Sequence, residues 1–181
     1  MGNCRGFSLF LTAILRPQGI PALARCGFGR YFLPDHFEDH WVCEYWNSAE
    51  LRWIMVDSQL DTFQMKTLEI QFNPLDVPDD QFITGGKVWQ ICRSGIVYPD
   101  QYGILDMHGW WFICGNVICD FLALNKVEIL PWDSGWGYLP NNLTDPLPDK
   151  MVLDIYDKIA NLTTTPVQSY SYIRCMFANN P

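Results

Sequence analysis

The sequence predicts an α+β fold, and three observations support that prediction. Of its 181 residues, 49% are apolar and 18% are charged, which is enough apolar material to bury a core. Apolar residues recur with helical spacing at the start of the chain and again near its end. Between them lie two short runs rich in aromatic and β-branched residues, the composition of paired strands. We therefore expect a helix, then a β-hairpin, then further helices.

The first element is predicted to be a helix over residues 4–16. Asn3 is a good N-cap, because its side chain can accept a hydrogen bond from an amide of the first helical turn. Arg16-Pro17 and Gly19 then end the helix. The apolar positions at i, i+3, i+4 and i+7, which predict one buried face, are Phe7, Phe10, Leu11 and Ile14.

A strand over residues 22–32, loosened by Gly27 and Gly29, is predicted next, followed by a polar loop over residues 34–39. The aromatic runs 40–46 and 51–57 then predict a β-hairpin. Its turn, residues 47–50, lacks the Asn-Gly signal, so the turn type stays open.

The pattern weakens after this hairpin. Gly85-Gly86 interrupt one of the predicted helices, and the tail from Thr163 reads as irregular. We expect residues 1–75 to form the core and residues 76–181 an extension packed on it rather than an independent domain. The other assignments are a short helix or strand (61–70), a connection (73–80), helices (79–94, 116–127 and 150–162) and a loop (131–149).

Charge and cysteine content exclude several classes of protein. Lys plus Arg number 12 and Asp plus Glu number 20, so the net charge of −8 argues against a partner that is nucleic acid or anionic membrane. The sequence has no run of 18 apolar residues, so we expect no helix that spans a membrane. Seven Cys cannot form a closed disulfide framework and suit a reducing compartment, so we expect a cytoplasmic protein. A signal-like start fails because Arg16 and Pro17 interrupt it.

Cys4 is the first candidate for chemistry. It falls in the first turn of the predicted helix, where backbone N–H groups and the helix dipole favour an anion. Arg5 adds a positive charge nearby. Such a position favours the thiolate and therefore a nucleophile, although a cysteine at a helix start is also a common inert residue.

His40 and Asp57 are the second and third candidates for chemistry, because the predicted hairpin brings them together. If residues 46 and 51 flank the turn, paired positions sum to 97, which sets His40 opposite Asp57 on one face of the hairpin. A carboxylate there can hold the imidazole in one tautomer while its other nitrogen faces a thiol. The alternative is an ordinary polar cross-strand pair. With Cys4 upstream, we favour a Cys4–His40–Asp57 triad.

Three other groups of residues have competing interpretations. His108 with Cys92, Cys114 and Cys119 could bind a metal, but without a second closely spaced pair buried thiols are the simpler reading. The acidic residues Asp35, Glu38 and Asp39 near His40 could bind a cation or a basic substrate, but a solvated acidic loop is the favoured interpretation. Trp132 and Trp136 fit either a substrate groove or packing. No metal and no cofactor are predicted.

The chain resembles the transglutaminase-like superfamily in four stretches that occur in that family's order. They are residues 2–7 (GNCRGF), 15–22 (LRPQGIPA), 38–42 (EDHWV) and 53–57 (WIMVD). The resemblance covers only residues 2–60 and looks closer to a prokaryotic branch than to the calcium-dependent animal enzymes. It implies a papain-like α+β fold, with the Cys-bearing helix packed on an antiparallel sheet. It also implies Cys4 as nucleophile, His40 as general base and acid, and Asp57 as the residue that orients His40.

One departure from the family pattern affects the predicted activity. Members usually carry helices before the Cys and a second oxyanion donor there, whereas only three residues precede Cys4 in this sequence. We therefore expect a truncated or misassigned start, a partner segment that completes the site, or an inactive chain. The Cys4 N–H can supply one oxyanion donor, and loss of a donor commonly costs about 10²–10³ in turnover.

Three functions follow as hypotheses. The first is a cysteine enzyme that acts on amide bonds of a protein or peptide through a thioester, by hydrolysis more than by crosslinking. The second is a catalytically incomplete binding or scaffold module that retains the fold. The third is a metal-binding regulator that uses the later Cys residues.

Overall fold

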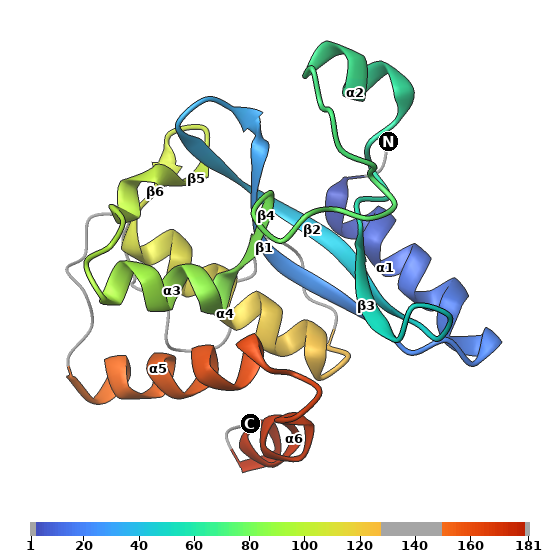
Figure 1. Cartoon of the computed structure of the whole chain (residues 1–181). Helices are drawn as coiled ribbons and strands as arrows, with labels where there is room; N and C mark the ends of the chain where they lie inside the picture. The colour runs from blue at the N-terminus through green and yellow to red at the C-terminus, as the bar shows by residue number, and fades with distance from the viewer. Residues whose placement is uncertain (1–2, 128–149, 180–181) are drawn as a thin grey trace.

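A mixed six-stranded sheet organises the residues that the computed structural model describes, which are 3–127 and 150–179 (Figure 1). The strands are β1 (Ala22–Leu33), β2 (His36–Asn47), β3 (Arg52–Val56), β4 (Phe82–Thr84), β5 (Tyr102–Ile104) and β6 (Met107–His108). The helices in these residues are α1 (Cys4–Leu15), α2 (Thr62–Thr67), α3 (Gly85–Arg93), α4 (Trp110–Leu124), α5 (Lys150–Thr164) and α6 (Tyr170–Asn179). The α+β class is therefore confirmed.

Strand β2 is the centre of the sheet because it pairs with three others. It lies antiparallel to β1 along most of its length. On its other edge it pairs antiparallel with β3 through residues 43–47 and parallel with β5 through residues 37–38. Strand β4 adds to β1, and β6 adds to β5. The single parallel pair makes the sheet mixed.

The hairpin β2–β3 forms, but the predicted register is wrong. Paired positions sum to 99, as in Asn47 opposite Arg52 and Cys43 opposite Val56. The turn is residues 48–51, because the Asn47 side chain accepts hydrogen bonds from the amides of Ala49 and Glu50. A shift of two residues keeps every side chain on its expected face, since side chains alternate with period two.

Residues 36–39, predicted as loop, belong to β2. Strands β1 and β2 form one long hairpin around a short turn at Pro34 and Asp35, where Asp35 adopts a left-handed φ of 57°. Asp tolerates that conformation better than most residues. Residues 36–39 are all partly buried in this strand, so their polar character did not mark a solvated loop.

Helix α1 forms as predicted but packs through a different face. Ser8 and Thr12 are buried, whereas Phe7, Phe10 and Ile14 remain 40%, 67% and 43% exposed. The Ser8 hydroxyl donates to the Trp41 carbonyl at 2.9 Å. Small polar residues let the helix approach β2 closely. The apolar face that periodicity predicted to be buried is therefore not the face that packs on the sheet.

The predicted helix over residues 79–94 is divided into β4 and α3. Gly85 and Gly86 begin α3 instead of weakening its centre. A Cβ on Gly85 would lie 2.8 Å from the Asn116 backbone, and one on Gly86 would lie 2.3 Å from the Thr163 hydroxyl. The two glycines therefore allow α3 to pack directly on α4 and α5.

The C-terminal region is more helical than predicted. Helix α4 begins six residues before the predicted start at residue 116, and α5 agrees closely with the prediction. The tail predicted to be irregular contains α6, whose Ile173 is fully buried. The predicted loop over residues 131–149 lies outside the described residues.

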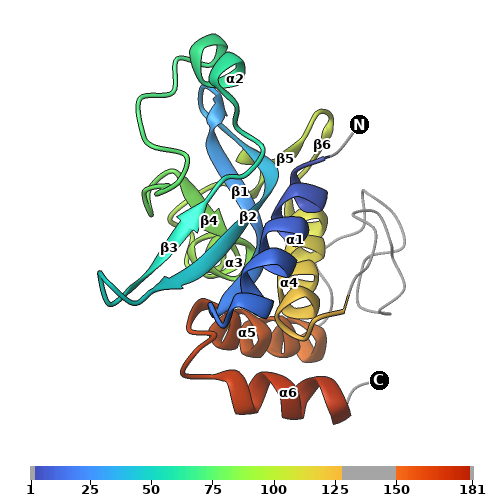
Figure 2. The same cartoon turned by 90° about the vertical axis from the view of Figure 1, so that its right-hand side faces the viewer.

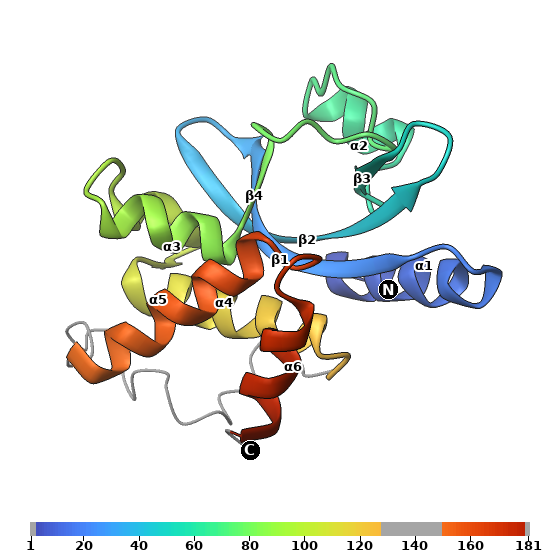
Figure 3. The same ribbon diagram turned by 60° about the horizontal axis from the view of Figure 1, so that its bottom comes forward.

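The sheet separates two regions of packing. Helices α1 and α4 cover one face of the β1–β2 ribbon, and the segment that carries α2 lies on the other (Figure 3). Both α1 and α4 pack on Ala24, Cys26 and Trp41. Figure 2 shows α5 and α6 beyond α4, where Trp89, Tyr156 and Ile173 fill the larger core. Among the described helices, none is both long and apolar enough to cross a membrane.

Candidate active site

Helix α1 holds Cys4 at its first position. The Asn3 side chain accepts a hydrogen bond from the Gly6 amide at 2.9 Å, as an N-cap should. Further along, the Thr12 hydroxyl donates to the Ser8 carbonyl at 2.8 Å and lies 3.3 Å from the Cys43 sulfur in β2. These contacts anchor the helix on the sheet, so the thiol of Cys4, which is half-buried, has a defined position.

His40 and Asp57 meet although they are not directly paired. The ladder between β2 and β3 ends at Val56, and Asp57 follows it. His40 lies diagonally across, and its Nε2 atom is 2.7 Å from Asp57 Oδ2. Because the register shift is two residues, both side chains stay on one face and can still reach each other. Both residues are buried.

The Cys4 side chain lies close enough to the His40 ring to help raise the pKa of His40. Since Asp57 occupies Nε2, the nitrogen left for the thiol is Nδ1. The three residues predicted from the sequence therefore lie together: Asp57 is bonded to the imidazole, and Cys4 is close to the same ring. This is the order of contacts that a cysteine nucleophile, its general base and an orienting carboxylate require.

Two groups that the sequence did not reveal complete the environment of Asp57. The Tyr31 hydroxyl donates to Asp57 Oδ2 at 2.6 Å, and the Gln59 amide donates to Oδ1 at 3.0 Å. The rings of Tyr31 and Phe32 pack edge-on against His40. Tyr31 reaches the site from the end of β1, and no spacing in the sequence relates it to Asp57.

The charges of this cluster favour a protonated imidazole. Burial lowers the pKa of His40, but hydrogen bonds to Asp57 and Cys4 outweigh burial and raise it to about 9. Burial works against the ionised Asp57 as well, yet its hydrogen bonds with His40 and Tyr31 hold its pKa below the usual value. At neutral pH His40 is therefore an imidazolium that donates from both ring nitrogens, which suits a neighbouring thiolate.

Two further features lie at the start of α1. The Arg5 guanidinium lies over the Trp41 ring, 5.7 Å from its centroid, and keeps a positive charge beside the first turn. The amides of the first turn have no acceptor within the helix, and the Asn3 side chain takes the one from Gly6. The Cys4 amide is thus placed to donate to an oxyanion.

The later cysteines do not assemble into a site. Within residues 3–127 and 150–179, no three His, Cys, Asp or Glu side chains are grouped as metal ligands. Cys92 and Cys114 are buried in the core, and burial raises the pKa of each thiol to about 12. His108 is at the surface beside Asp100. Cys119, on α4, lies near Cys26 and helps raise its pKa, and the Cys26 thiol donates to the Asn116 side chain at 3.1 Å.

The three acidic residues around the β1–β2 turn lie in different environments and do not form one cluster. Asp39 accepts a hydrogen bond from the Asn116 amide at 3.0 Å and lies against α4. Glu38 is only partly buried, and its pKa is raised by burial. Asp35 is in the turn itself. Trp132 and Trp136 lie outside the described residues.

Comparison with known proteins adds no assignment. No family model, no curated protein and no solved structure matches this chain.

Proposed function

We propose that this protein is a transglutaminase-like cysteine enzyme that cleaves amide bonds through a thioester. The observation that carries the proposal is the 2.7 Å contact between Asp57 Oδ2 and His40 Nε2, together with a Cys4 side chain near enough to the His40 ring to help raise its pKa. The helix that begins at Cys4, packed on antiparallel strands β1 and β2, supports the papain-like core that the sequence resemblance implies.

Each step of the proposed reaction is assigned to one residue. The Cys4 thiolate attacks the amide carbonyl, and the resulting oxyanion accepts a hydrogen bond from the Cys4 amide. The His40 imidazolium gives its Nδ1 proton to the departing amine as the C–N bond breaks. Neutral His40 then removes a proton from water, which attacks the thioester and releases the acid and the thiolate. Asp57 holds the ring in place throughout.

Thiol reactivity tests the proposal. With iodoacetamide at pH 7, we expect Cys4 to be alkylated at least about tenfold faster than Cys175, the exposed free thiol that serves as internal reference. In a His40→Ala variant the Cys4 rate should fall to that of Cys175. Mass spectrometry of the modified peptides measures both. Equal rates in the unmodified chain would contradict an activated Cys4.

Turnover tests the remainder of the mechanism. A panel of peptide amides should be hydrolysed by the unmodified chain and not by Cys4→Ala. Addition of a primary amine distinguishes hydrolysis from crosslinking, because an amide product forms only if the amine competes with water.

A second function, a binding module that retains the fold without catalysis, is favoured by one observation. Phe7, Phe10 and Ile14 present an apolar face on α1 that the described residues leave exposed. This alternative predicts no preferential alkylation of Cys4 and no turnover that depends on it.

A further inference from the structure

A groove beside the candidate active site is the strongest remaining feature of the molecule. Residues 58–81 leave the sheet after Asp57, form α2 and return to β4. The Asp57 amide donates to the Pro74 carbonyl, and the Val77 amide donates to the Met55 carbonyl, which close the base of this excursion. Between the excursion and β1 lies a cavity of about 500 Å³. We call it the Tyr31 groove, after the residue that links it to the site.

Tyr31 connects the groove directly to the catalytic residues. Its ring lines the groove and packs edge-on against Phe72, with centroids 5.2 Å apart. Its hydroxyl donates to the carboxylate of Asp57, which in turn binds His40. Burial is the main cause of the raised pKa of Tyr31. The negative charge of Asp57 adds to it, and Cys4 makes a smaller contribution in the same direction. A molecule in this groove therefore contacts Tyr31, which links the groove to Asp57 through its hydroxyl.

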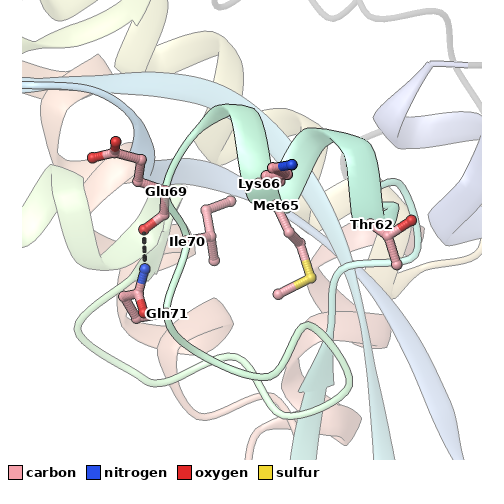
Figure 4. A pocket seen from close by; sticks show the side chains of 6 residues that line it. All are labelled: Thr62, Met65, Lys66, Glu69, Ile70 and Gln71. Carbon is pink, nitrogen blue, oxygen red and sulfur yellow. Dashed lines mark hydrogen bonds between the residues drawn. The ribbon is translucent and has the colours of Figure 1, made fainter.

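The lining of the groove combines an apolar wall with negative charge. Tyr31, Leu68, Phe72 and Pro78 supply the apolar surface, and Glu69 and Asp80 supply two exposed carboxylates. The nearby cation, Lys66, lines the neighbouring pocket instead. Figure 4 shows that pocket, of about 490 Å³, and the hydrogen bond from the Gln71 side chain to the Glu69 carbonyl, 2.9 Å, in the segment that borders both.

We infer that the Tyr31 groove binds an arginine side chain of the peptide substrate. A guanidinium stacks on aromatic rings such as Tyr31 and Phe72, and it pairs with carboxylates such as Glu69 and Asp80. The net charge of −8 favours approach of a cationic peptide. The arginine serves as an anchor and takes no part in the chemistry. This inference rests on the proposed function, because it makes the groove a substrate site.

Binding to the Cys4→Ala chain tests the inference without requiring turnover. The probe is a short fluorescein-labelled peptide amide with one central arginine, compared with the same peptide carrying citrulline, which is neutral and has nearly the same shape. Fluorescence anisotropy should give about tenfold tighter binding for arginine at low salt, with the difference shrinking as salt is added.

Two variants assign the effect to the groove. Glu69→Gln combined with Asp80→Asn should reduce the preference for arginine to less than about twofold. Asp106→Asn, an equal change of a carboxylate at an exposed position away from the groove, should preserve it. All three side chains are exposed, so the substitutions leave the core unchanged. Equal binding of the two peptides, or equal loss in the control, overturns the inference.

The two proposals fail in different ways. If Cys4 shows no enhanced alkylation but arginine is still preferred, the groove binds cationic peptides and the proposed chemistry is wrong. If Cys4 is activated and turns over amides without any preference for arginine, the chemistry stands and the assignment of the groove is wrong.

Discussion

Asp39 precedes His40 in β2 but lies in a different environment. Its carboxylate is partly buried against α4 and accepts a hydrogen bond from the Asn116 side chain. Burial raises its pKa to about 6, against the opposing effects of Asn116 and His40. The folded chain therefore holds a proton on Asp39 at pH values where the unfolded chain, with a pKa near 3.8, has released it. Stability should fall as pH rises through this window.

Asp39→Asn should stabilise the protein only above that window. The amide oxygen of Asn can still accept from Asn116, while the ionisation penalty disappears. We expect a gain of about 1–3 kcal/mol at pH 8 and none below pH 3.8. Urea unfolding at both pH values measures this, with Asp106→Asn as the exposed control. A gain that is equal at both pH values would contradict the burial of an ionised Asp39.

Helix α1 shows how a small polar face can outweigh an apolar one. Ser8 is fully buried and hydrogen-bonded to β2, whereas Phe10 is 67% exposed. The position of Cys4 depends on this close contact, since a bulky residue at position 8 would lift the first turns of the helix away from His40.

The apolar periodicity of α1 predicts that Phe10 matters more for stability than Ser8. The observed packing predicts the reverse. Ser8→Leu should cost about 1–3 kcal/mol, because it overpacks the interface and removes the hydrogen bond to Trp41. Phe10→Gln should change stability by less than about 0.5 kcal/mol. Denaturant midpoints measure both, and Cys4 alkylation should slow only in Ser8→Leu. A larger cost for Phe10→Gln would place the helix on its other face.

At the scale of the whole molecule, Arg25 joins elements that are far apart in the sequence. Its guanidinium binds Glu44 of β2 at 2.7 Å and both carboxylate oxygens of Asp120 in α4 at 2.9 and 3.0 Å. It also donates to the Thr163 carbonyl of α5 at 2.7 Å. Asp120 in turn accepts the Cys26 amide of β1. This cluster ties residues 1–75 to residues 76–181.

Arg25→Met should destabilise the protein by about 3–5 kcal/mol, since it leaves Asp120 and Glu44 without their cation in the interior. Arg52, which also pairs with two carboxylates but is exposed, is the matched control, and Arg52→Met should leave the unfolding midpoint nearly unchanged. Circular dichroism and tryptophan fluorescence should report one coincident transition in all three chains. Two separate transitions would show that residues 76–181 fold independently.

Local chemistry accounts for what could be predicted here. The N-cap Asn3, the breakers at the end of α1 and the aromatic runs of β2 and β3 act over a few residues, so their elements were recognisable. The candidate residues Cys4, His40 and Asp57 were identifiable because each has a reactive group at a recognisable place in such an element. The turn residues 48–51 carry no strong signal, and the register was therefore missed by two.

Tertiary packing decided the rest. Only close approach to β2 selected the Ser8 face of α1, and only contact with α4 and α5 explains Gly85 and Gly86. Tyr31 contacts Asp57 because the end of β1 lies beside the site. Residues 58–81 form one wall of the groove because backbone hydrogen bonds hold the base of this segment against β3. Sequence alone thus determined the reactive groups and most local elements. Their environment depends on contacts between distant residues, and local patterns do not encode those contacts.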